Sequence, residues 1–138
     1  MLDQRLTTPW WTLRLAYGLV PIVAGLDKFT NILTDWTQYL SPSLARVLPL
    51  APSTFMQLVG IVEIAAGVLV LSKLTRIGAY VVAAWLVLIA LNLLTTFRFF
   101  DVAVRDLVLA LGAFTLARLT EVRTAEARRV SSRVPVPA

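Results

Sequence analysis

The sequence predicts an all-α protein, a transmembrane four-helix bundle with an amphipathic extracytoplasmic loop between its first and second helices. Of the 138 residues, 58% are hydrophobic and only 15% are charged, and the mean hydropathy is +0.77. A soluble domain of this size has too large a surface-to-volume ratio to bury so much apolar surface, so lipid is the expected solvent. The chain also contains four apolar runs, each near the length of about 20 residues that a helix needs to cross a bilayer.

We expect a single domain over residues 1–123, with helices at about residues 11–29, 55–72, 76–97 and 102–120. Two tryptophans stand at the start of the first run, and two phenylalanines follow the third run. Aromatic residues are expected at such positions, where helices meet the membrane surface. A short basic turn joins the second and third runs. The fourth run is short, so its helix is expected to continue past Arg118, whose long side chain reaches the headgroups.

The connection between the first two helices, residues 30–54, has a pattern of its own. Its apolar residues recur at helical spacing between polar ones, which predicts an amphipathic segment on the membrane surface. These residues are Trp36, Tyr39, Leu40, Leu44, Val47 and Leu48, and the prolines Pro42, Pro49 and Pro52 break the segment into short pieces. The segment is either a lid that covers loop backbone or a gate or docking surface over the outer mouth of the bundle.

The distribution of positive charge predicts the orientation. With four crossings, both termini and the turn between the second and third helices share one side, which holds nine of the thirteen Lys and Arg residues. This bias makes both termini cytoplasmic in a multi-pass membrane protein. The membrane we expect, from the family resemblance given below, is the bacterial or archaeal inner membrane. The basic cytoplasmic tail, residues 124–138, is expected to begin as a helical extension and then fray. Topology and anionic lipid headgroups account for the net charge of +5, and no nucleic-acid partner is expected.

The residue types that are missing exclude several kinds of chemistry. The chain contains no cysteine and no histidine, so disulfides and haem, zinc or copper sites built by this chain alone are almost excluded. No spacing indicates a nucleophile beside a base, and there is no Gly-rich phosphate loop. We therefore expect no catalytic residue, no metal and no cofactor bound by this chain alone, although Glu63 with Asp106 as an acid–base pair remains conceivable.

Each apolar run nevertheless carries polar residues, and these are the candidate functional residues. Glu63 lies near the middle of the second run, where a lone carboxylate costs about 3 kcal/mol or more on insertion, so the protein must solvate, pair or use it. Helical phase places Gly60 and Glu63 on one stripe, and the first helix has a similar stripe from Arg14 through Gly25 to Lys28. Small residues on a stripe let helices approach closely, so these faces are expected to meet inside the bundle.

The other two helices carry polar residues in phase with small or aromatic ones, Asn92 with Trp85 and Asp106 with three alanines. Most of the expected cluster lies in the outer half of the bundle, while Arg14 lies near the inner end, where water or Glu63 would serve it. Its members are Lys28, Glu63, Asn92, Asp106, Arg14, Asp27 and Arg105.

Two interpretations of this cluster stay open. In the structural one, Lys28 or Arg105 pairs with Glu63 or Asp106, and Asn92 completes a hydrogen-bonded network that fixes the bundle. In the functional one, the cluster lines a pocket open to the outer leaflet and binds a polar head, such as a quinone ring or a lipid.

Three segments of the chain resemble the DoxX-like family of small membrane proteins. They are RLAYGLVPIVAGLDKF, with its Gly-x-x-Lys end; GIVEIAAGVLVLSKLTRIGAY, with Glu-x-x-x-Gly and a basic turn; and RDLVLALGAFTL. The resemblance covers about residues 14–116. The chain departs from the family at one point. Many members have a histidine just before the Gly-x-x-Lys, where this chain has Val23-Ala24.

The resemblance implies a four-helix inner-membrane protein, with Arg14, Lys28, Glu63 and Asn92 as functional candidates by match of position. Some members are associated with quinone-linked oxidation of sulfur compounds and others with redox assemblies. The expected function is therefore that of an accessory subunit in a larger, redox- or quinone-linked membrane complex, with no redox centre of its own. The alternatives are a quinone-reactive subunit of a thiosulfate:quinone oxidoreductase-like enzyme and a stand-alone lipid- or small-molecule-binding protein.

Overall fold

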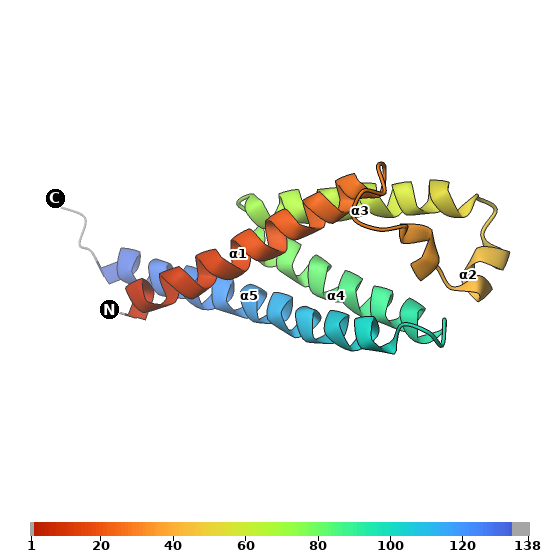
Figure 1. The fold of residues 1–138 in the computed structure, drawn as a ribbon. Coiled ribbons are helices and arrows are strands. Elements are labelled where there is room, and N and C mark those ends of the chain that lie inside the picture. The colour runs from red at the N-terminus through yellow and green to blue at the C-terminus, as the bar shows by residue number, and fades with distance from the viewer. Residues whose placement is uncertain (1, 134–138) are drawn as a thin grey trace.

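The computed structural model describes residues 2–133, and within that range the chain is all-α, as the composition predicts (Figure 1). Four long helices dominate, and two short helical pieces occupy the connection between the first and second of them. The elements are α1 (Leu2–Asp27), the 3₁₀ helix η1 (Trp36–Tyr39), α2 (Pro42–Val47), α3 (Pro52–Leu71), α4 (Thr75–Leu94) and α5 (Phe100–Arg133).

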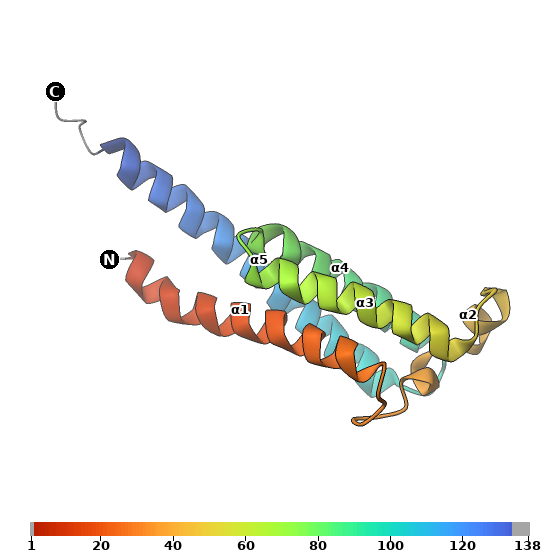
Figure 2. The same ribbon diagram turned by 90° about the horizontal axis from the view of Figure 1, so that it is seen from above.

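The long helices form two packed pairs, α1 with α3 and α4 with α5, and contacts of α3 with α4 and of α1 with α5 join the pairs. Both chain ends lie at the end of the bundle that also holds the α3–α4 turn, which we call the terminal end (Figures 1 and 2). The opposite end, where residues 30–51 connect α1 to α3, is the loop end. Helix α5 extends beyond the α3–α4 turn at the terminal end (Figure 2).

Glycines set the distance between α1 and α3. A Cβ atom placed on Gly25 would lie 2.5 Å from the carbonyl oxygen of Gly60, and one placed on Gly60 would lie 2.5 Å from that of Gly25. Any larger residue would therefore overlap the backbone of the facing helix, and small residues at helix contacts permit this kind of close approach. The predicted meeting of the two glycine stripes is confirmed.

Small residues also fill the contact between α4 and α5. Near the terminal end, Ala79 of α4 and Ala113 and Ala117 of α5 are fully buried beside Val70 of α3. Near the loop end, a second buried cluster joins α4 to α5 through Ala90, Leu93 and Ala103. The alanine stripe predicted on the fourth helix therefore faces the interior.

Helix α1 is longer than the sequence predicts, because it begins at Leu2 and not near residue 11. The helical extension expected from residue 124 is present and is continuous with α5 as far as Arg133. The extra turns contact each other and α4. The Trp10 indole of α1 donates to Thr120 Oγ1 of α5 at 2.8 Å, and the Arg123 guanidinium of α5 lies 4.5 Å from the centre of the Trp10 ring. Tyr80 of α4 donates to Glu121 of α5 at 2.9 Å. Tertiary contacts thus continue the helices past the apolar runs. Residues 134–138 of the expected tail lie outside the described residues.

The connection of residues 28–51 breaks at its prolines as predicted. Pro42 opens α2 and Pro52 opens α3, where a residue without an N–H costs the helix nothing. Asn31 adopts a positive φ of 50° just after α1, and its amide donates to Asp27 O at 2.7 Å, an ending typical of helix C-termini. The amphipathic segment therefore consists of two short helical pieces and no continuous helix.

Two helices of the described chain, α3 and α4, are long and apolar enough to cross a membrane by length and composition. Only 33% of the apolar window of each is buried. The core helix of a soluble protein would hide most of such a window, so the exposed apolar surface needs another cover.

The glycine contact between α1 and α3 generates a stability prediction. Gly60→Ala forces the two backbones apart and should destabilise the protein by about 1–3 kcal/mol, the usual cost of overpacking. Thermal unfolding of the purified protein in detergent measures this cost. Ala65→Val, which adds bulk on the exposed side of the same helix, is the matched control, and equal melting temperatures for the two variants would contradict the proposed close packing.

Candidate ligand-binding site

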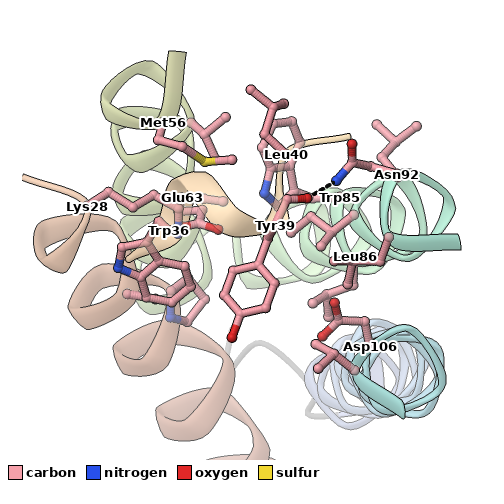
Figure 3. Close-up of a pocket in the computed structure, with 18 of the residues that line it drawn as sticks. Lys28, Trp36, Tyr39, Leu40, Met56, Glu63, Trp85, Leu86, Asn92 and Asp106 are labelled. Atoms are coloured by element: carbon pink, nitrogen blue, oxygen red, sulfur yellow. Dashed lines mark hydrogen bonds and ion pairs between the residues drawn. The ribbon is translucent and has the colours of Figure 1, made fainter. Parts of the chain in front are cut away.

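A cavity of about 450 Å³ opens between the two helix pairs toward the loop end. Most of its wall is apolar, and polar side chains from α3, α4 and α5 and from the residue directly after α1 reach it (Figure 3). They include four residues predicted for the cluster: Lys28, Glu63, Asn92 and Asp106. Helices that are far apart in sequence therefore bring these groups to one space.

Lys28 and Glu63 form a buried ion pair, with Nζ 2.6 Å from Oε2 and side chains 3% and 9% exposed. The glycine contact positions them, because a Cβ on Gly60 would lie 3.1 Å from Lys28 Cβ. The ammonium also lies 3.7 Å from the centre of the Trp36 ring, which attracts a cation through its π face. Of the pairings left open by the sequence, the structure contains that of Lys28 with Glu63.

Asp27, next to Lys28, organises the loop. Its carboxylate accepts hydrogen bonds from the amides of Ile32 and Leu33 at 3.0 and 3.1 Å and from the Trp36 indole at 2.8 Å. It also accepts one from the Thr30 hydroxyl at 3.0 Å. Asp27 therefore holds Trp36 in place over the Lys28 ammonium.

Asn92 attaches the other side of the loop to α4. Its side-chain amide donates to Tyr39 O at 2.7 Å, and its side-chain oxygen accepts from the Ser41 amide at 3.1 Å. The Tyr39 ring packs 4.8 Å from that of Phe99, in the α4–α5 turn. Residues 36–41, which we call the strap, therefore run across the loop end of the cavity from α1 to α4.

Two polar groups in the cavity wall have no hydrogen-bond partner among the described residues. The indole nitrogen of Trp85 is buried beside Glu63 and makes no hydrogen bond of normal geometry. Asp106 is half-buried and has neither a salt bridge nor a hydrogen bond to its side chain, and it is close enough to Glu63 for the carboxylates to repel each other. An N–H donor and a carboxylate thus remain available to a bound molecule.

Two of the predicted cluster residues lie elsewhere. Arg14, at the terminal end, donates hydrogen bonds to three backbone carbonyls at the end of α3: those of Leu71, of Val70 (3.2 Å) and of Ser72 (2.8 Å). These carbonyls, and not water or Glu63, therefore accept the hydrogen bonds of its guanidinium group. Arg105 points away from the cavity and lies 3.9 Å from Asp101, both largely exposed. Arg14 therefore stabilises the end of α3, and Arg105 contributes no charge to the cavity wall.

The sequence did not identify the aromatic wall of the site. Trp36 and Tyr39 were visible only as apolar positions of the loop, and Trp85 only as a residue in phase with Asn92. Their role depends on the path of the strap, which the hydrogen bonds of Asp27 and Asn92 determine. In the described part of the chain, no group of three His, Cys, Asp or Glu side chains is arranged to hold a metal ion.

The fold and the site define an all-α protein whose helices surround a mostly apolar cavity that also holds a few charged and polar side chains. The chain belongs to the DoxX family, whose model matches residues 10–97, more than half of its length. The family predicted from the three sequence segments is thus confirmed, although the match ends before α5 and the RDLVLALGAFTL segment. No curated protein and no solved structure matches the chain.

The buried ion pair generates a second prediction. Lys28→Met leaves the Glu63 carboxylate without its partner and should cost about 3–5 kcal/mol of stability, the range for breaking a buried pair. Replacing both residues, as Lys28→Met with Glu63→Leu, should cost less than Lys28→Met alone because no charge stays behind. Thermal unfolding measures both. Arg105→Met, which removes one member of an exposed pair, should change stability by at most about 1 kcal/mol. An equal loss for Lys28→Met and Arg105→Met would contradict a buried pair.

The attachment of the strap generates a third prediction. Asn92→Leu removes both hydrogen bonds to the strap, so the Ser41 amide should exchange its hydrogen about tenfold faster or more, since each bond contributes about 0.5–1.5 kcal/mol. Hydrogen–deuterium exchange of peptides covering residues 36–41 measures the effect. Thr115→Val, which removes an exposed hydrogen bond within α5, should leave this exchange unchanged. Unchanged exchange in Asn92→Leu would mean that other contacts hold the strap.

Proposed function

We propose that the protein is an integral-membrane protein whose four long helices cross the bilayer, and that its cavity binds the polar head of a lipid-soluble molecule. It acts in this proposal as an accessory subunit without a redox centre of its own. The observation that carries the proposal is the cavity itself, whose apolar wall holds an unpartnered indole N–H and an unpaired carboxylate.

Exposed apolar residues on every long helix support the membrane location. Large apolar side chains project outward from each of them, for example Val20 on α1, Ile61 on α3, Leu88 on α4 and Leu111 on α5. Helices α1 and α5 carry more charged residues than α3 and α4. Several of these charged residues face the inside of the protein. Arg14 and Lys28 are bonded within the protein, and Asp106 faces the cavity. Intramembrane charges in membrane proteins show this inward placement.

The positions of the basic residues support an orientation with the terminal end in the cytoplasm. Lys73 and Arg76 lie at the α3–α4 turn, and the arginines of the α5 extension follow on the same side. Such an excess of positive charge marks the cytoplasmic side of a membrane protein. The loop end, with the strap and the cavity, then lies toward the outer leaflet.

The size of the cavity and its chemistry support a small ligand with a polar head. Its volume of about 450 Å³ falls within the range of about 300–1,000 Å³ usual for small-molecule sites. A quinone ring or a lipid head fits the pattern of a mostly apolar wall with a few polar groups. The accessory role rests on the family membership and on the absence of cysteine and histidine, which leaves electron transfer to a partner protein.

Mass spectrometry of the protein purified gently from its own membrane tests the proposal. We expect a retained lipid-soluble molecule at up to one per chain, and on a native gel the chain should migrate with larger subunits. Ala24→Phe, which fills the cavity, should lose the molecule, whereas Val23→Phe, on the exposed side of the same helix, should keep it. A wild-type protein without any bound molecule, or equal retention in both variants, would contradict the proposed site.

A further inference from the structure

We propose that the ligand head is a protonated amine and that the molecule is a lipophilic amine with a single apolar chain. This inference rests on the proposed binding function and names the chemical class of the ligand. It follows from the charge balance of the cavity wall, from its aromatic rings and from the side on which the cavity is open.

The charge balance favours a cation. The residues lining the cavity contribute one ammonium, Lys28, and two carboxylates, Glu63 and Asp106. Lys28 and Glu63 neutralise each other at 2.6 Å, so within residues 2–133 Asp106 is left without a counter-ion. The nearest basic residue in sequence, Arg105, is exposed beside Asp101 and does not compensate it. An unpaired carboxylate in an apolar space is costly, and a cationic ligand would remove that cost.

The aromatic residues support the same conclusion. Trp36 and Tyr39 of the strap and Trp85 of α4 line the cavity, and in Figure 3 Tyr39 lies between Trp36 and Asp106. Aromatic faces attract cations most strongly where water is excluded. The protein already uses this attraction for Lys28, whose ammonium lies over Trp36. An anionic head would instead meet two carboxylates and the negative faces of these rings.

The open side of the cavity indicates where the apolar chain of the ligand would lie. Val20 of α1 and Leu109 of α5 line the cavity and are also 64% and 46% exposed. Toward the terminal end, α1 and α5 come together and close the cavity. There the Tyr17 hydroxyl donates to Leu109 O at 2.7 Å, and Gly112 makes room for the Tyr17 ring. A chain leaving the cavity between α1 and α5 would therefore enter the hydrocarbon of the outer leaflet, while its amine stays near Asp106.

Native mass spectrometry of the full chain in dodecyl maltoside tests the inference with three probes of equal chain length: dodecylamine, dodecanol and dodecanoate. We expect one bound dodecylamine per chain, with an affinity about tenfold or more above that of dodecanol, because hydrogen bonds to charged groups are the stronger ones. Dodecanoate should bind more weakly than dodecanol. Equal affinity for the amine and the alcohol in the wild-type protein would overturn the inference without any variant.

A pair of variants locates the effect. Asp106→Asn should lower the affinity for dodecylamine about tenfold and leave that for dodecanol unchanged, and Asp101→Asn, the exposed control, should change neither. An unchanged amine affinity in Asp106→Asn would overturn the role of this carboxylate. If dodecanol binds and Ala24→Phe abolishes its binding, the proposed binding function of the cavity is supported even where the preference for an amine is not. If no probe binds, both the proposed binding function and the amine preference are contradicted.

Competition distinguishes two sources of such an amine. Lysophosphatidylethanolamine that displaces dodecylamine, where lysophosphatidylcholine does not, would identify the amine head of a single-chain membrane lipid as the ligand. Displacement by neither lipid, with the amine preference intact, would identify a free lipophilic amine.

Discussion

The close contact of α1 with α3 at Gly25 and Gly60 is the constraint on which the site depends. Only because neither residue has a side chain do the helices approach closely enough to bring Lys28 to within 2.6 Å of Glu63. Without that pair, a carboxylate near the middle of α3 would be left inside an apolar bundle at a cost of several kcal/mol. Backbone packing and charge neutralisation are therefore one feature of this fold, and a change in either one disturbs the other.

The cavity exists because the two helix pairs are joined firmly at the terminal end and only indirectly at the loop end. Near the terminal end, Trp10 and Tyr17 of α1 bond to α5, and the buried alanines of α5 pack beside α3 and α4. Toward the loop end the pairs separate, and the strap connects them through Asp27 on one side and Asn92 on the other. The space between them collects polar groups from α3, α4 and α5 and from Lys28 directly after α1, which gives a small bundle room for a ligand.

The sequence predicted much of this arrangement, because helical phase alone fixes which residues share a face. The glycine stripes, the inward direction of Glu63 and the break of the connection at Pro42 all follow from spacing and from proline chemistry. The partners of Arg14 did not follow, since they are carbonyls at a helix end, and their position depends on the α3–α4 turn. Arg105 was grouped with Asp106 through proximity in sequence, yet adjacent helical residues point about 100° apart. The path of the strap was equally out of reach, because hydrogen bonds to distant helices determine it.

Asn92 holds the strap by hydrogen bonds to the main chain of Tyr39 and Ser41. The attachment to α4 is therefore independent of these two side chains, provided that the backbone conformation is kept, whereas on the α1 side Asp27 holds the strap through the Trp36 indole. Exchanges at positions 39 and 41 could accumulate during evolution without loss of the two hydrogen bonds to Asn92. Such a design lets related proteins diverge in what they recognise while inheriting an unchanged scaffold.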